Sequence, residues 1–198
     1  MNKCIIVGAS PIINEFKYDD NDFIIGVDGG ISFLLKHHYK ISLGVGDFDS
    51  LGYVPNDIKI IKLDPIKDIT DTNRALLEAY NLGYKEIEIY GCLGGRIDHS
   101  IAIIQDGYKY HSMGLKITIF GDKQRITYLT NSSLKLNKKD GYISIFALDS
   151  AKGVSIKNLK YEVNDITLNN TYPLGVSNEF INKNAYIEVK QGTLLIVY

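Results

Sequence analysis

The chain has 198 residues, of which 45% are hydrophobic, and its formal net charge is −1. This length accommodates one large domain or two small ones, each with its own core. Nearly balanced charge provides no broad basic surface for nucleic acid or an anionic membrane, and the apolar runs are too short to cross a bilayer. We therefore expect neither nucleic acid nor a membrane as a partner.

The cysteines and the start of the chain predict a cytoplasmic protein. The apolar run in MNKCIIVGAS is too short for a secretory signal and is typical of a first buried strand. Cys4 and Cys92 each fall within an apolar, strand-like run, which favours reduced, buried thiols over a disulfide. The four histidines show no metal-ligand spacing.

Strand-like and helix-like segments alternate through the first part of the chain. Short apolar runs that end in Gly or Asp occur at 3–9, 23–30, 43–50, 58–64, 86–95 and 115–122. Helical patterns occupy 31–40, 70–83 and 98–110, and the second has an acidic first turn and a Gly stop. This alternation predicts an α/β domain with a mainly parallel, Rossmann-like sheet.

The pattern changes after about residue 124. Short strands separated by Asn, Gly, Asp and Lys turns are predicted at 125–130, 142–149, 152–159, 161–165, 166–170, 177–181, 185–190 and 193–198. Such spacing favours an antiparallel β-sandwich or barrel. We therefore expect an α/β domain over 1–124 and an all-β domain over 125–198, packed together because no Pro/Ser-rich linker separates them.

Charged residues gather where the predicted parallel strands end. They are Asp28 in DGG, Asp47 and Asp49 in GDFDS, Lys67, Asp68 and Asp71 in KDITD, and Arg96, Asp98 and His99 after Gly94 and Gly95 in GGRIDH. In an open α/β sheet, ligands bind outside the carboxyl ends of the strands. These motifs should therefore share one edge.

Each acid alone is more often a turn or helix-cap residue, and Asp71 could merely cap its helix. Several carboxylates on one edge, however, need a compensating cation. Oxygen ligands without His or Cys favour Mg²⁺, which is usually held by carboxylates together with substrate phosphates. Lys67 and Arg96 are natural phosphate partners, and the glycines allow close backbone approach. The sequence thus predicts Mg²⁺ carrying a nucleotide.

The motifs VDGG, GDFDS, KDITD and GGRIDH, in this order and spacing, resemble the thiamine pyrophosphokinase family, as do GVSNEF and VKQGTLLIVY near the end. The resemblance covers essentially the whole chain. It implies transfer of the β,γ-pyrophosphoryl group of ATP to the hydroxyl of thiamine, with release of AMP. It also implies a homodimer whose sites lie between the α/β domain of one chain and the β domain of the other.

The resemblance assigns roles to individual residues. Asp47, Asp49 and Asp71 would bind Mg²⁺ and pyrophosphate and, with Arg96, act in catalysis. Apart from the resemblance, we expect one carboxylate, Asp71 or Asp49, to accept the hydroxyl proton. The ATP-binding positions would be Asp28, Gly29, Lys67, Asp68, Gly94, Gly95, Asp98 and His99. Ser177, Asn178 and Phe180 would meet thiamine from the partner chain. Some family members have a Trp near the end, where this chain has Ile196, so Phe180 or a nearby Tyr could replace it; Phe180 could equally be a core residue.

Two other functions compete with this interpretation. GDFDS also resembles the DxDx[TS] motif of haloacid-dehalogenase-type phosphatases, whose first Asp is a nucleophile. That reading leaves DGG, KDITD and GGRIDH unexplained. A nucleotide-binding regulatory protein without turnover is the other alternative, and the presence of Lys67, Arg96 and the acids argues against it. Release of AMP rather than ADP from ATP and thiamine would distinguish all three.

Overall fold

The computed structural model describes residues 2–10, 16–49, 57–64 and 68–198. The chain divides into two compact units, residues 1–123 and residues 124–198. We describe each unit separately.

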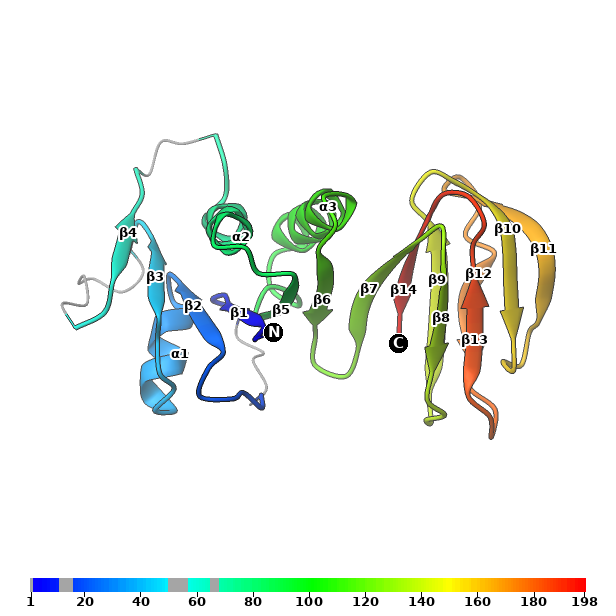
Figure 1. The fold of residues 1–198 in the computed structure, drawn as a ribbon, viewed down its shortest axis with the longest axis horizontal. Coiled ribbons are helices and arrows are strands. Elements are labelled where there is room, and N and C mark those ends of the chain that lie inside the picture. Colours follow the sequence, from blue (N-terminus) through cyan, green and yellow to red (C-terminus); the bar gives the residue numbers. More distant parts are fainter. Residues whose placement is uncertain (1, 11–15, 50–56, 65–67) are drawn as a thin grey trace. The chain divides into compact units, whose positions relative to one another are not determined.

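Unit 1 is built on a parallel sheet. Its strands lie in the order β6-β5-β1-β2-β3-β4 (Figure 1), and every neighbouring pair is parallel. The strands are β1 (Cys4–Val7), β2 (Phe23–Val27), β3 (Leu43–Gly46), β4 (Ile60–Lys62), β5 (Glu86–Tyr90) and β6 (Lys116–Phe120). The order reverses at β1, since β2 lies on one side of it and β5 on the other. The predicted α/β fold is confirmed.

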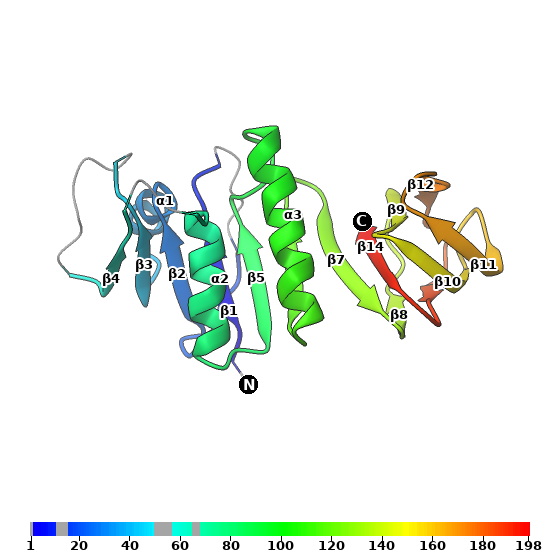
Figure 2. The same cartoon turned by 90° about the horizontal axis from the view of Figure 1, so that it is seen from above.

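Helices that cover the sheet in the described part of unit 1 are α1 (Gly30–Lys36), α2 (Asp71–Asn81) and α3 (Ile97–Ser112). Figure 2 shows α2 and α3 on one face and α1 on the other. Helix α2 packs through residues with no exposed surface, among them Ala75, Leu76 and Ala79. On the α1 side, Phe16 stacks between Tyr39 and Tyr90, with ring centroids 4.5 Å and 4.7 Å away. The contact with Tyr90 packs the end of β5, just before the loop that carries GGRIDH.

Unit 2 contains two antiparallel layers, β12-β9-β14-β7 and β11-β10-β13-β8. The strands are β7 (Arg125–Thr130), β8 (Ser133–Leu136), β9 (Tyr142–Ala147), β10 (Ser150–Lys157), β11 (Val163–Asn169), β12 (Gly175–Glu179), β13 (Ala185–Glu188) and β14 (Thr193–Val197). Their inward side chains form one apolar core, which includes Ile143, Ile187 and Ile196. The predicted all-β region is confirmed.

Two details of unit 2 differ from the prediction. The segments 161–165 and 166–170 were expected to be separate strands but form the single strand β11. Asp165 in its middle has φ +57°, where the pairing with β10 is irregular, so turn-forming residues mark a bulge rather than a turn. Strand β8 was not predicted, because its sequence SLKL is short and has no fully buried residue.

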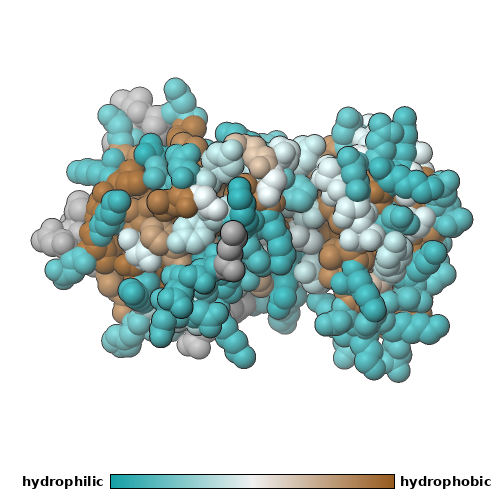
Figure 3. Space-filling model, viewed as in Figure 1, coloured by the Kyte–Doolittle hydropathy of each residue, from teal (hydrophilic) through white to brown (hydrophobic). Residues whose placement is uncertain are grey.

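In the face shown in Figure 3, hydrophilic side chains cover most of both units and apolar side chains show between them as patches. Among the described residues, no helix is both long and apolar enough to span a membrane.

Candidate active site

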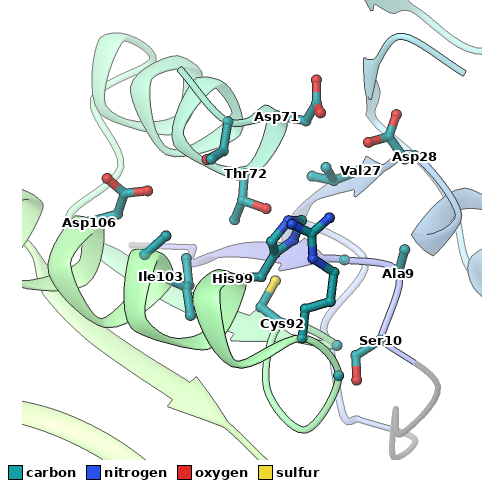
Figure 4. Close-up of a pocket in the computed structure, with 16 residues that line it drawn as sticks. Ala9, Ser10, Val27, Asp28, Asp71, Thr72, Cys92, His99, Ile103 and Asp106 are labelled. Carbon is teal, nitrogen blue, oxygen red and sulfur yellow. The ribbon is translucent and has the colours of Figure 1, made fainter. Parts of the chain in front are cut away.

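A cavity of about 370 Å³ opens in unit 1 at the carboxyl ends of β1, β2 and β5 (Figure 4). The first turn of α2 and one face of α3, from its first turn to mid-helix, form its other walls. Its lining residues are Gly8, Ala9, Ser10, Val27, Asp28, Thr70, Asp71, Thr72, Gly91, Cys92, Gly95, Arg96, His99, Ala102, Ile103 and Asp106. This is the crevice beside the strand-order reversal, where an open α/β sheet binds its ligand.

Asp28 is the carboxylate at the end of β2. Its backbone has φ +44°, and its Oδ1 accepts a hydrogen bond from the Phe48 amide at 3.5 Å. A side chain at Gly46 would overlap this carboxylate, so glycine lets β3 approach it. Burial, followed by the charge of Asp71, raises the pKa of Asp28 to about 6. Crowded carboxylates of this kind favour a bound cation.

Asp47 and Asp49 follow β3 but do not line the cavity. Between them lies Phe48, whose backbone has φ +64° and whose buried side chain anchors the loop. The Asp49 amide donates to Asp47 Oδ1 at 3.2 Å, and the charge of Asp47 contributes to the raised pKa of Asp28. Across the described ranges, no three His, Cys, Asp or Glu side chains are arranged to hold a metal ion.

Asp71 begins α2 and faces the cavity (Figure 4). The cap of this helix is Thr70, whose Oγ1 accepts from the Asn73 amide at 3.0 Å. Capping therefore does not explain Asp71, whose charge contributes, after burial, to the raised pKa of Asp28.

Arg96 immediately precedes α3, and both Arg96 and His99 line the cavity. The Arg96 Nε donates to Asp98 Oδ1 at 3.1 Å, and this pair raises the pKa of Arg96 and lowers that of Asp98. Both side chains are largely exposed, at 71% and 62%. Gly94, with φ +83°, permits the loop that brings Gly95 to the cavity wall.

The other residues expected at the nucleotide site lie elsewhere or cannot be placed. Lys67 falls outside the described residues. Asp68 is exposed and does not line the cavity. Gly29 is the N-cap of α1 and lines an adjoining surface hollow, which shares Ser10 with the cavity.

Several lining residues were missed from the sequence. Gly8, Ala9 and Ser10 follow β1 and line the cavity. They lie at a strand end, where ligands bind, but they carry no charge and so were not predicted as site residues. Cys92 was predicted within a strand but lies just after β5. Burial raises the pKa of its thiol to about 12, and both cysteines are free thiols.

Asn178 of β12 is buried, with 5% of its surface exposed. Its Nδ2 donates to the Tyr161 carbonyl at 2.7 Å, and its Oδ1 accepts from the amides of Tyr161 at 3.0 Å and Glu179 at 2.9 Å. The side chain thereby fastens the loop between β10 and β11 to β12.

The neighbours of Asn178 differ from it. Ser177 is exposed, has φ +58°, and its amide donates to Ser144 Oγ at 3.1 Å. Phe180 is partly buried and packs against the core of unit 2, with Lys139 Nζ 5.7 Å from its ring centroid. Ile196 is a fully buried core residue.

The fold and the cavity define a two-unit protein with a cavity at the carboxyl edge of its parallel sheet, where open α/β sheets bind their ligands. Residues 17–119 match the family model "Thiamin pyrophosphokinase, catalytic domain", and residues 131–194 match "Thiamin pyrophosphokinase, vitamin B1 binding domain". The chain therefore belongs to the thiamin pyrophosphokinase family, whose members are enzymes.

Individual proteins agree with this assignment. The chain is similar to thiamine pyrophosphokinase of Bacillus subtilis (strain 168), with 29% identity over 191 residues that cover 90% of this chain and 88% of the relative. The crystal structure of thiamine pyrophosphokinase from Bacillus subtilis has a TM-score of 0.88 and 25% identity, with 99% of this chain and 98% of that chain covered. A thiamin pyrophosphokinase family protein from Enterococcus faecalis has a TM-score of 0.86 and 26% identity, at 99% and 98% coverage.

Proposed function

We propose that this protein transfers the β,γ-pyrophosphoryl group of ATP to the hydroxyl of thiamine, giving thiamine diphosphate and AMP. The observation that carries this proposal is the cavity of unit 1, which gathers Asp28, Asp71, Arg96 and His99 at the carboxyl edge of the sheet in a chain of this family. Neither a phosphatase nor a regulatory protein is favoured by the family matches.

The acidic side chains suit Mg²⁺ because carboxylate oxygens are its preferred protein ligands. Asp47, Asp49 and Asp71 would hold the ion, and the influence of both Asp71 and Asp47 on the pKa of Asp28 supports their proximity. When bound, Mg²⁺ would neutralise part of the negative charge of the phosphates. Asp28, Gly29, Lys67, Asp68, Gly94, Gly95, Asp98 and His99 would complete the ATP site.

The chain's own groups would position the reactants. The thiamine oxygen attacks the β-phosphorus, the bond from that phosphorus to the AMP oxygen breaks, and the hydroxyl proton passes to Asp71 or Asp49. Arg96 would orient the phosphates through its planar guanidinium. The thiazolium cation of thiamine suits an acidic edge.

For thiamine, unit 2 would supply Ser177, Asn178 and Phe180. The exposed position of Ser177 supports direct contact. The three hydrogen bonds of Asn178 to backbone groups support a positioning role instead. Phe180 is only partly buried, so part of its side chain would be available for contact with thiamine.

A cytoplasmic homodimer with shared sites completes the proposal. Two free thiols suit a reducing compartment. Strand β12 is an edge strand of its layer, and exposed apolar residues lie on or near it, namely Tyr142, Tyr161, Tyr172, Leu174, Val176 and Ile181. Such residues suit an interface between copies. Mixing an Asp49→Asn chain with a chain disabled at Asn178 should restore activity if sites are shared. No recovery in a mixture shown to exchange subunits would contradict sharing.

The deciding experiment mixes the protein with ATP, Mg²⁺ and thiamine and follows nucleotide products by chromatography. We expect AMP and thiamine diphosphate in equal amounts. Inorganic phosphate released without thiamine would indicate a phosphatase, and ATP binding without any product would indicate a regulatory protein.

A further inference from the structure

Asp106 forms the end of the cavity that lies away from the acidic cluster. In Figure 4 it lies on the α3 side of the cavity, while Asp28 lies on the opposite side. Both line the same cavity. None of the motifs recognised in the sequence includes Asp106, and the proposed phosphate chemistry does not use it.

The position of Asp106 along α3 separates it from the phosphate partners. His99, Ala102, Ile103 and Asp106 all line the cavity and are spaced i, i+3, i+4 and i+7, so one face of the helix forms the wall. Seven residues from His99 to Asp106 correspond to about 10 Å at 1.5 Å per residue. A ligand whose phosphates meet Arg96 and His99 would therefore need to extend along this wall to reach Asp106.

The chemistry of this end suits a nucleoside. Ile103 is buried and, with Ala102, gives the wall an apolar surface between the two polar ends. Asp106 is partly buried, and its Oδ1 accepts from Asn73 Nδ2 at 2.5 Å. Within the described part of the chain, no hydrogen bond is donated to its Oδ2, which can accept one from a ligand.

The bond to Asn73 also fixes where the carboxylate points. Asn73 is 8% exposed and lies in the first turn of α2, where its backbone N–H donates a hydrogen bond to Thr70 Oγ1. The Tyr110 hydroxyl donates to the Asn73 carbonyl at 3.4 Å. Burial raises the pKa of Asp106, and the Asn73 amide opposes this rise. A carboxylate held on one oxygen and open on the other is preorganised as an acceptor.

We propose that Asp106 accepts a hydrogen bond from a ribose hydroxyl of ATP and selects ribonucleotides over deoxyribonucleotides. The inference rests on the proposed function, because it places the triphosphate between Asp106 and the acidic cluster. A carboxylate is a natural partner for ribose hydroxyls, which donate hydrogen bonds. Phosphates carry no such donor and would be repelled by it.

The test measures binding of AMP, 2′-deoxy-AMP, 3′-deoxy-AMP and IMP by isothermal titration calorimetry, which needs neither metal nor turnover. A hydrogen bond to a charged group corresponds to about 10- to 100-fold in affinity. We expect the wild type to bind AMP more tightly than at least one deoxy analogue by this factor. Asp106→Ala should lose the preference. Asp106→Asn should also reduce it while keeping an acceptor for Asn73, which separates recognition from packing.

The exposed neighbour provides the matched control, since Gln105→Ala should keep the full preference. Thermal melts verify that each variant is folded. The inference is overturned if the wild type binds AMP and both deoxy analogues equally, if it binds no AMP, or if the preference survives in Asp106→Ala. A different result would be that Asp106→Ala loses a preference for AMP over IMP while keeping the preference for AMP over the deoxy analogues. That result would assign Asp106 to the base amine and would also overturn the inference. Ribose selection without product formation would refute the proposed function alone.

Discussion

The two regions expected to meet the substrates are built in opposite ways. In unit 1, burial and then the charges of Asp71 and Asp47 raise the pKa of Asp28. In unit 2, Asn178 is buried and bonded to backbone groups of Tyr161 and Glu179. The first arrangement destabilises the unliganded fold and favours a cation, whereas the second stabilises the fold itself.

This difference separates residues that act on a ligand from residues that support them. Like charges held close together lower stability, so their retention requires a compensating partner. A buried amide with its hydrogen bonds satisfied stabilises the fold irrespective of any ligand. Substitutions in the two regions should therefore move activity and stability in different directions.

The largest effect is expected for the acidic cluster. Asp71→Asn should lower turnover by about 10²-fold or more, because a carboxylate that neutralises phosphate charge through the metal is lost. Its stability in EDTA should stay the same or rise, because Asp28 loses a like-charged neighbour. Steady-state assays and urea titrations measure the two quantities. Asp20→Asn, at an exposed position, is the control and should change neither. Near-normal activity of Asp71→Asn at saturating Mg²⁺ would remove Asp71 from the metal site.

The opposite result is expected in unit 2. Asn178→Ala removes three hydrogen bonds from a buried site, which should lower the free energy of unfolding by about 2–4 kcal/mol. Asn182→Ala, which loses one exposed bond to Lys138, should cost less than about 0.5 kcal/mol. Chemical denaturation gives both values. A stable Asn178→Ala protein with a raised KM for thiamine would instead make Asn178 a substrate contact.

Arg96 tests whether the basic side of the cavity acts on the ligand alone. Arg96→Ala should raise the KM for ATP by about 10-fold through loss of a phosphate partner. Its stability should be unchanged, because the pair with Asp98 is exposed. Arg74→Ala, which breaks an ion pair with Glu78 within α2, should leave the KM for ATP unaltered. An unaltered KM in Arg96→Ala would make Arg96 an ordinary surface charge.

Local sequence signals predicted the strands and helices of unit 1 well. Each apolar run is followed by a Gly or Asp motif, and helical patterns lie between several of these runs. They also predicted that Asp28, Asp71, Arg96 and His99 share one edge of the sheet, and these four residues line one cavity. They missed Ser10 and Asp106, since one is an ordinary strand-end residue and the other lies in mid-helix. Only the packing of α3 on the sheet shows which face of that helix is turned to the cavity. In unit 2 the Asn and Asp of β11 were misread as a turn, because sheet pairing overrode their local preference.

The smallest effect is expected at Ser177, a residue that could affect both ligand binding and the stability of the fold. Its φ of +58° is unfavourable for a side chain, so Ser177→Gly should relieve strain and stabilise the fold by up to about 1 kcal/mol. If the hydroxyl binds thiamine, the same variant should raise the KM for thiamine by a few-fold, consistent with loss of one neutral hydrogen bond. Ser177→Ala separates the effects, because it loses the hydroxyl but keeps the strained Cβ. We expect Ser177→Ala to match Ser177→Gly in KM and the wild type in stability. A KM unchanged in both variants would place Ser177 outside the thiamine site and leave its conformation as a feature of β12 alone.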